Sequence, residues 1–287
     1  MPELAYVNGR IMPIEEAKVP INDRGYHFAD AVYEFISGYH GRLFAFEAHL
    51  DRLERSLRAL SFPPISRDSI REAIEKIFQA AALDNGGVYL QISRGVAPRN
   101  HPFPINVQPQ IIITVRSLPE TPRAYLENGI HVITVTDIRW GRCDIKTVQL
   151  LPNVLARQQA LDAGAQDAIF ISPEGVVREA TSSNLFIVKD NTLQTHPLTP
   201  NILPGVTRGC LLEICREEGI PVQEIFFNHH TLLSADEVFI TSTVAEVLPV
   251  TRIDGRSIGA GCPGPLTQRL RTLLETQAGK TDSINKK

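Results

Sequence analysis

The chain has 287 residues, of which 43% are hydrophobic and 21% are charged, and its formal net charge at pH 7 is −3. This balance is typical of a globular protein and argues against a disordered chain. The 29 basic residues are scattered among 32 acidic ones, so we expect no basic surface and no nucleic-acid partner. The length favours two modest domains over a single small core.

The first part of the chain predicts a sheet covered by two helices. Asn8-Gly9 predicts a tight turn between two short strands. Leucines at helical spacing from Leu50 to Leu60 predict a helix, and apolar positions from Ile70 to Phe78 predict another, which begins at a capping box formed by Ser69 and Glu72. Alternating β-branched and aromatic residues predict strands over 31–39, 42–46, 87–95 and 109–118.

Two prolines between Leu118 and Arg123 interrupt any regular pattern and favour a linker there. We therefore expect a small N-terminal domain over 1–118, a linker over 119–123 and a larger C-terminal domain over 124–287. The polar tail from Gly279 is expected to fray. Periodicity and turn residues predict the elements of the second part, which are strands over 130–136, 168–172, 176–179, 185–188, 192–195 and 237–243, and helices over 153–163, from about 205 to 219, and around 266–274.

Two further expectations concern location and metals. The first nine residues hold neither a basic segment nor a long apolar one, and no later apolar run has the length of a membrane span, so we expect a cytoplasmic protein with no membrane partner. The cysteines form no CxxC pair and no Cys/His cluster with zinc spacing, which favours free thiols and no metal. Cys143 has no identifiable partner base, so a packing role is favoured.

Lys146 is the residue with the most distinctive chemical setting, because an apolar run follows it. Burial among apolar side chains disfavours the ammonium form and lowers the pKa of a lysine. The neutral amine is a nucleophile suited to Schiff-base formation with a carbonyl. Most lysines near apolar sequence instead keep the ammonium in water, and this alternative stays open from the segment alone. The run consists of Val148, Leu150, Leu151, Val154 and Leu155.

The segment Cys143-Asp144-Ile145-Lys146, followed by Leu150-Leu151, resembles the cofactor-lysine segment of the fold-type IV pyridoxal phosphate enzymes, specifically the D-amino-acid transaminases. The likeness continues in family order over nearly the whole chain. The matching motifs are Asp23-Arg24-Gly25-Tyr26, Val32-Tyr33-Glu34, His49-Leu50-Asp51-Arg52-Leu53, Pro98-Arg99-Asn100-His101, Glu179 with Ser182-Ser183-Asn184, Gly205-Val206-Thr207-Arg208 and Thr241-Ser242-Thr243.

The resemblance implies an α+β, fold-type IV architecture, with a small N-terminal α/β sandwich-like domain and a larger, strand-rich C-terminal pseudo-barrel domain. It implies pyridoxal 5'-phosphate as the cofactor, bound to the catalytic Lys146, with Glu179 facing the ring nitrogen. The remaining matches imply phosphate ligands at Arg52, Val206, Thr207 and Thr243. A helix start at Val206 would present unpaired N–H groups to such an anion. No glycine-rich nucleotide-binding motif occurs.

The loop that contains Arg99 and His101 is rich in proline and is not expected to be helical. The matching Arg and His of the D-amino-acid transaminases, with the tyrosine that matches Tyr33, trap the substrate α-carboxylate, a task that suits a guanidinium fork. The family's loop reaches the partner subunit's site. The resemblance therefore implies a homodimer in which each site is completed near the interface.

The implied activity is a ping-pong D-amino acid:2-oxo acid aminotransferase that uses a Lys146 internal aldimine, with D-alanine, D-glutamate, pyruvate and 2-oxoglutarate as expected substrates. Three alternatives stay open, because the fold does not decide the reaction. A branched-chain L-amino-acid transaminase is disfavoured by the Arg99-Asn100-His101 loop. An aminodeoxychorismate lyase would need no amino acceptor, and a binding protein without catalysis would leave the cofactor residues unexplained.

The sequence departs from the family pattern at positions that carry no reacting group. Ala29, Ala31 and Ala180 stand where glycine is common, and Gln149 stands where asparagine is frequent. An added methyl group near the cofactor would narrow the pocket or move a loop. These departures bear on the preferred side chain of the substrate more than on the reaction.

Overall fold

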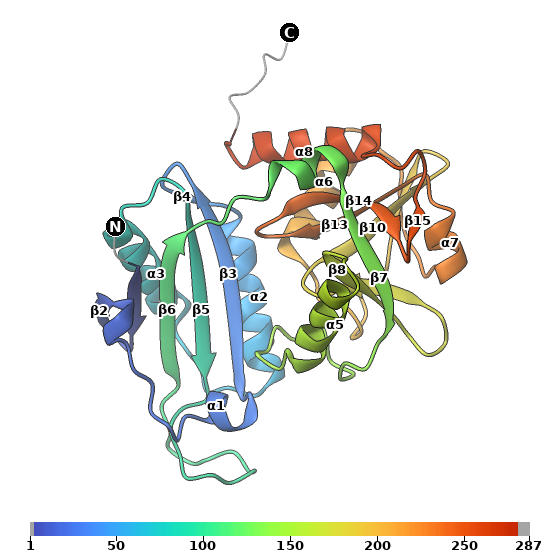
Figure 1. Cartoon of the computed structure of the whole chain (residues 1–287). Coiled ribbons are helices and arrows are strands. Elements are labelled where there is room, and N and C mark those ends of the chain that lie inside the picture. Colours follow the sequence, from blue (N-terminus) through green and yellow to red (C-terminus); the bar gives the residue numbers. More distant parts are fainter. Residues whose placement is uncertain (1–2, 281–287) are drawn as a thin grey trace. The chain divides into compact units, whose positions relative to one another are not determined.

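A computed structural model describes residues 3–280 (Figure 1). Contacts divide the chain into two compact units. The first holds residues up to Pro119 together with Ile145–Gln149, and the second holds Glu120–Asp144 and the chain from Leu150 onward. The short segment that contains Lys146 therefore belongs with the first unit, although both of its neighbouring segments belong with the second. The expected ranges of 1–118 and 124–287, with a linker between them, stay a prediction.

The first unit contains, within the described residues, one six-stranded antiparallel sheet. The strand order is β2-β1-β6-β5-β3-β4. A hairpin at the expected Asn8-Gly9 turn joins the first two strands, and Asn8 adopts the left-handed backbone that such a turn requires (φ 47°). The strands are β1 Leu4–Val7, β2 Arg10–Pro13, β3 Ala31–Tyr39, β4 Arg42–Leu43, β5 Gly86–Ser93 and β6 Gln110–Ser117.

Helices α2 (Phe46–Ala59) and α3 (Arg67–Ala81) pack against this sheet, and the core between them is aliphatic. Ser66 caps α3 by accepting a hydrogen bond from the Ser69 N–H, so the expected start at Ser69 was wrong by one turn. Two short helices, η1 (Ile14–Glu16) and α1 (Arg24–Phe28), were not expected. Ala29 ends α1 with φ 55°, which explains why glycine suits this position.

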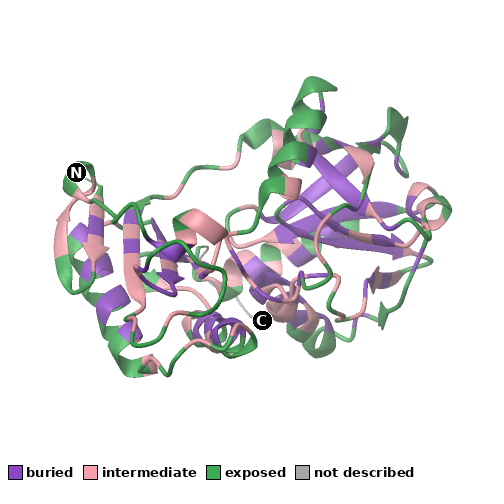
Figure 2. Cartoon of the chain, turned by 90° about the horizontal axis from the view of Figure 1, so that it is seen from below, coloured by how far each residue is buried: buried purple, intermediate pink, exposed green. Residues whose placement is uncertain are grey.

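The second unit is built around a closed barrel. The ladder β10-β13-β14-β7-β8-β9 returns to β10 through a further pairing, so six strands of the described chain form a ring. Figure 2 shows the barrel strands as largely buried. The strands of this unit are β7 Ile130–Thr136, β8 Asp167–Ile171, β9 Val177–Ala180, β10 Asn184–Lys189, β11 Thr192–Thr195, β12 Val222–Glu224, β13 Glu237–Ser242, β14 Glu246–Ile253 and β15 Arg256–Ser257.

The second unit also contains helices, which precede, connect or follow its strands along the chain. They are α4 Arg123–Asn128, α5 Leu151–Asp162, α6 Val206–Glu217, α7 His229–Leu233 and α8 Pro265–Gln277. The expected helices near 153–163, 205–219 and 266–274 correspond to α5, α6 and α8. Strand β14 and helices α4 and α7 were not expected. The expected frayed tail falls mostly on residues 281–287, which lie outside the described residues.

The described chain, residues 3–280, has no helix that combines the length and apolarity needed to cross a membrane. Within the same range, no three His, Cys, Asp or Glu side chains gather as a metal site would require.

Candidate active site

Lys146 lies at the edge of strand β3. The Lys146 carbonyl accepts a hydrogen bond of 3.0 Å from the Tyr33 N–H, and the Val148 N–H donates to the Ala31 carbonyl at 3.3 Å. The Lys146 N–H donates to Ser56 Oγ on α2 at 3.2 Å. The backbone is therefore held on two sides. The side chain is half-buried, and Nζ lies 4.2 Å from the centroid of the Tyr33 ring.

Three of the apolar residues that follow Lys146 are exposed, while Lys146 itself is half-buried. Leu151, Val154 and Leu155 belong to α5, where they are 68%, 59% and 55% exposed. The helix begins at Leu151, and residues three and four positions later share its face. This apolar face of α5, formed by these three residues, is therefore open to solvent in the single chain.

A buried charged cluster lies between β3 and α2, on the face of the sheet that the helices cover. Arg52 donates from Nε and Nη2 to the two oxygens of Glu34, both at 2.7 Å, and His49 Nδ1 lies 2.8 Å from Glu34 Oε2. Burial opposes ionisation of Glu34, but its contacts with Arg52 and His49 prevail and lower its pKa to about 2. For His49, burial disfavours the charged imidazolium and lowers the pKa. The cluster is fully formed within the first unit.

Glu34 and His49 contact Arg52, and sequence reasoning gave neither of them a role. A glutamate in a strand of apolar residues, facing the helix-covered side, was the available signal for Glu34. On α2, the positions of His49, Arg52 and Ser56 share one helical face, which places three polar side chains on the buried side. This pattern distinguishes Arg52 from the solvated residue that its amphipathic helix alone suggests.

The opposite face of the sheet carries Tyr33. Its ring centroid lies 5.7 Å from that of Tyr89 on β5, and the Tyr89 hydroxyl donates to Gln91 Oε1 at 2.7 Å. Burial raises the pKa of Tyr89 to about 12, so its hydroxyl stays protonated. Lys146 and three polar or aromatic residues of two strands thus gather on this face. Tyr89 and Gln91 are also residues that sequence reasoning missed.

Arg99 and His101 are exposed and meet at one aromatic ring. The Arg99 guanidinium carbon lies 5.1 Å from the Phe28 centroid, and the His101 ring centroid lies 5.3 Å from it. Arg24 donates to the carbonyls of Asn100 and His101 at 2.5 and 3.1 Å. The structure therefore brings Arg99 and His101 together, while Tyr33 lies with Tyr89 and Lys146.

Arg24 is itself held by Asp30, which it contacts through Nε at 2.8 Å. Asp30 also pairs with Arg94, whose guanidinium donates to the Ser61 and Leu60 carbonyls. These side chains are almost fully buried. A chain of buried ion pairs therefore fixes the backbone from which the side chains of Arg99 and His101 project.

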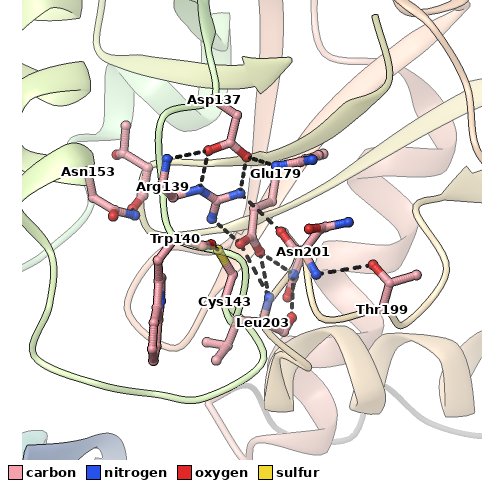
Figure 3. Close-up of polar contacts among 12 residues, drawn as sticks. Asp137, Arg139, Trp140, Cys143, Asn153, Glu179, Thr199, Asn201 and Leu203 are labelled. Atoms are coloured by element: carbon pink, nitrogen blue, oxygen red, sulfur yellow. Dashed lines mark hydrogen bonds and ion pairs between the residues drawn. The ribbon is translucent and has the colours of Figure 1, made fainter. Parts of the chain in front are cut away.

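In the second unit, Glu179 on β9 has each carboxylate oxygen engaged (Figure 3). Oε1 accepts a hydrogen bond of 2.5 Å from Arg139 Nη1, and Oε2 accepts from Asn184 Nδ2 and the Leu203 N–H at 3.0 and 3.1 Å. Burial raises the pKa of Glu179 above its ordinary value, and Arg139 acts in the opposite direction. The site thus presents a buried carboxyl group with a nearby cation.

The first turn of α6 lies next to this carboxyl group. Gly205 is the N-cap residue of α6. It has no side chain that could accept hydrogen bonds from the first N–H groups of the helix, at Val206 and Thr207. A Cβ on Gly205 would stand 2.0 Å from Asn184 Oδ1, so only glycine permits this approach. Asn184 bonds both Glu179 and the Leu203 carbonyl, which links the helix start to Glu179.

Thr243 follows the end of β13. Two residues earlier, Thr241 pairs with Asn184 on β10, which in turn pairs with Glu179 on β9. Glu179 and the segment leading to Thr243 therefore lie on neighbouring strands. The buried Thr241 Oγ1 has no hydrogen-bond partner among the described residues.

Cys143 is buried and its thiol donates to the Trp140 carbonyl at 3.2 Å. Burial raises its pKa to about 11. The protonated thiol is a poor nucleophile, which agrees with the packing role expected for Cys143.

The sequence model of the family described as "Amino-transferase class IV" matches residues 31–253. The chain is a class IV aminotransferase. The match includes Lys146 and the whole barrel, and it confirms the fold-type IV class expected from the sequence. The pseudo-barrel of that expectation is the closed six-strand ring of the second unit.

Relatives with curated names resemble this aminotransferase over nearly its full length. The "D-alanine aminotransferase" of Bacillus licheniformis is 44% identical over 93% of this chain and 94% of its own, and that of Staphylococcus haemolyticus is 42% identical over the same shares. Among solved structures, the branched-chain amino acid aminotransferase of Escherichia coli has a TM-score of 0.91 and 28% identity, and covers 99% of this chain and 97% of its own.

A second solved structure bears on the kind of ligand. The T.th. branched-chain amino acid aminotransferase, solved with pyridoxamine 5'-phosphate, has a TM-score of 0.89 and 28% identity, and covers 98% of this chain and 96% of its own. The aminotransferase described here thus shares its fold with an enzyme that holds an aminated, phosphorylated pyridine.

Proposed function

We propose that this aminotransferase transfers the amino group of a D-amino acid to a 2-oxo acid. Identity of 40–44% to D-alanine aminotransferases over at least 93% of the chain is the observation that carries the proposal. The solved branched-chain enzymes share the fold at 26–28% identity. D-Alanine or D-glutamate as donor, with pyruvate or 2-oxoglutarate as acceptor, are the proposed substrates.

The described residues fit pyridoxal 5'-phosphate. This cofactor supplies an aldehyde that condenses with amines and a ring that takes up electrons from the substrate Cα. Lys146 would hold the aldehyde carbon, and Glu179 would face the ring nitrogen. Arg52, Val206, Thr207 and Thr243 would bind the phosphate. The support in the structure is an α6 start without a side-chain cap and a buried carboxyl group joined to it through Asn184.

The protein's own groups carry the proton transfers. Lys146 Nζ, once displaced by the substrate amine, would take the proton from the substrate Cα and return it to the carbon that bore the aldehyde. Its backbone bonds to Tyr33 and Ser56 would keep the amine in place throughout. Because donor and acceptor use one site in turn, the kinetics would be ping-pong.

Arg99 and His101 would bind the substrate α-carboxylate with Tyr33. The guanidinium and imidazole lie around one phenylalanine ring on a backbone fixed by Arg24, which favours a rigid pair of donors. Both side chains are exposed in the single chain. We propose that they complete the site of a partner subunit in a homodimer. The cytoplasmic location expected from the sequence stays a prediction.

Visible absorbance of the purified protein, reconstituted with pyridoxal 5'-phosphate, tests the function. We expect D-alanine alone, without acceptor, to remove the visible band, because half of a ping-pong reaction needs no acceptor. L-Leucine should leave the band unchanged. Loss with L-leucine alone would favour a branched-chain transaminase. Pyruvate release from aminodeoxychorismate, with no acceptor requirement, would favour the lyase, and the absence of any band would refute the enzyme as proposed.

The apolar face of α5 supports the homodimer, because Leu151, Val154 and Leu155 expose three aliphatic side chains at helical spacing. We expect a mass near twice 31.8 kDa in analytical ultracentrifugation. Val154→Glu should shift the protein toward the monomer by placing a charge in the interface. Phe226→Glu is the matched control, since Phe226 is equally exposed, at 59%, but lies elsewhere in the second unit. A monomeric unmodified protein would contradict this proposal.

A further inference from the structure

Four charged side chains of alternating sign form a series in the second unit. Arg178 Nη1 lies 2.6 Å from Asp137 Oδ2. Asp137 lies 2.8 Å from Arg139 Nη2, and Arg139 Nη1 lies 2.5 Å from Glu179 (Figure 3). The side chains of Asp137 and Arg139 are 0% and 5% exposed. At this depth a charge is costly unless it is paired, so each member of the series depends on its neighbours.

Arg139 is the junction of the series, and its guanidinium has little freedom. Nε and Nη2 donate to the two oxygens of Asp137, Nη2 also donates to the Asn201 carbonyl, and Nη1 is left for Glu179. One face of the guanidinium lies 4.3 Å from the Phe170 ring centroid. Because all three nitrogens of the planar Arg139 guanidinium donate hydrogen bonds and one face lies against an aromatic ring, the group is held in a single orientation. That orientation directs Nη1 at Glu179 Oε1.

Glu179 needs such a partner. Its other bonds, from Asn184 and the Leu203 N–H, come from neutral groups. Among residues 3–280, Arg139 is the cation in ion-pair contact with this carboxylate. Burial makes a carboxyl group harder to ionise when no cation is near, and burial raises the pKa of Glu179. A protonated Glu179 would be a hydrogen-bond donor. A cofactor ring nitrogen that carries a proton is also a donor and needs an acceptor instead.

We propose that Arg139 is a positioning residue that keeps the Glu179 carboxylate ionised and oriented toward the ring nitrogen of the cofactor, and that Asp137 fixes Arg139 for this task. This inference rests on the proposed pyridoxal 5'-phosphate chemistry. Arg139 acts through Glu179 and need not touch the cofactor. The role predicts that the effect of losing Arg139 depends on the presence of the Glu179 carboxylate.

A double-mutant cycle on pyridoxal 5'-phosphate affinity tests the role. We expect Arg139→Gln to raise the dissociation constant about ten- to a hundredfold, the effect of losing a hydrogen bond to a charged group. In a Glu179→Gln background the same change should alter it by less than about threefold. Arg142→Gln is the control, because Arg142 lies in the same segment but forms an exposed ion pair with Asp144. It should leave the affinity unchanged.

A kinetic measurement accompanies the cycle. At saturating cofactor, Arg139→Gln should lower kcat for D-alanine at least about tenfold and leave KM within about twofold, since Glu179 acts on the cofactor ring and not on the substrate carboxylate. Arg139→Lys, which keeps a cation, should recover part of kcat. A general loosening of the fold would raise KM as well and would not be relieved by lysine.

The outcomes separate this inference from the proposed function. If the unmodified protein neither binds the cofactor nor uses D-alanine, the function fails. If it does both and Arg139→Gln behaves like Arg142→Gln, or costs as much in the Glu179→Gln background as alone, the role of Arg139 is overturned. Should circular dichroism show that Arg139→Gln does not fold, Arg139→Lys takes its place in the cycle. Its expected loss of affinity is about three- to tenfold, and a loss below twofold would overturn the role.

Discussion

Replacing Lys146 with alanine is expected to abolish turnover, with a loss of about 10⁴-fold or more, because in the proposed function the amine would both hold the cofactor and move the substrate proton. Formation of pyruvate from D-alanine and 2-oxoglutarate measures the rate. The variant should fold, since the bonds that attach this segment to β3 and α2 come from the backbone of Lys146 and not from its side chain.

Lys189→Ala is the matched control for this result. Lys189 is also a lysine with a defined hydrogen bond, in its case to the Ser234 carbonyl at 2.6 Å, but its contact lies on an exposed part of the second unit. It should retain the unmodified rate. A Lys146→Ala enzyme that turns over at a near-normal rate would refute the assignment of the catalytic amine.

Replacing Glu34 with glutamine is expected to lower the free energy of unfolding by about 3–5 kcal/mol, because it leaves the Arg52 guanidinium buried without a counter-charge. Urea denaturation at pH 7 measures the change. The unmodified protein should lose stability as the pH falls from about 4.5, the ordinary pKa of Glu34, toward its folded value of about 2. The direction follows because the lowered pKa stabilises the fold only while Glu34 is ionised.

Glu47→Gln provides the comparison. Glu47 lies on α2, the helix that carries Arg52. Its hydrogen bonds with Arg71 and Arg67 also lower its pKa to about 2, but its side chain is 62% exposed. Water screens such a pair, so its removal should change stability little. Equal losses in the two variants would show that burial does not govern the strength of the Glu34–Arg52 pair.

The secondary structure was predictable where a single period ran through many residues. The strand at 31–39 and the helices now numbered α2 and α3 follow from local pattern. The start of α3 was misplaced because Ser66 and Ser69 both satisfy the composition of a cap, and only the backbone geometry decides between them. The closed ring of the barrel depends on the pairing of β9 with β10, which no local pattern reports.

The proposed site residues come from motif resemblance, whereas the residues that hold them in place do not. Lys146, Glu179 and Thr207 stand in recognisable segments, whereas Arg139 is recognised only once its guanidinium is seen between Asp137 and Glu179. Local sequence also did not show that apolar residues after Lys146 are exposed, because exposure depends on how the helix that carries them packs. A helix that begins five residues later carried them to its own exposed face.

The division of the first unit between two stretches of chain has a consequence for synthesis. Residues 145–149 leave the ribosome only after residues 120–144, which include strand β7 of the other unit. Until then the Tyr33 N–H and the Ala31 carbonyl lack the hydrogen bonds that they later form with Lys146 and Val148. In a nascent chain that ends at residue 119, this part of the β3 edge lacks its covering segment, and exposed strand edges are sites at which chains associate. The segment that covers this edge is the one that contains Lys146.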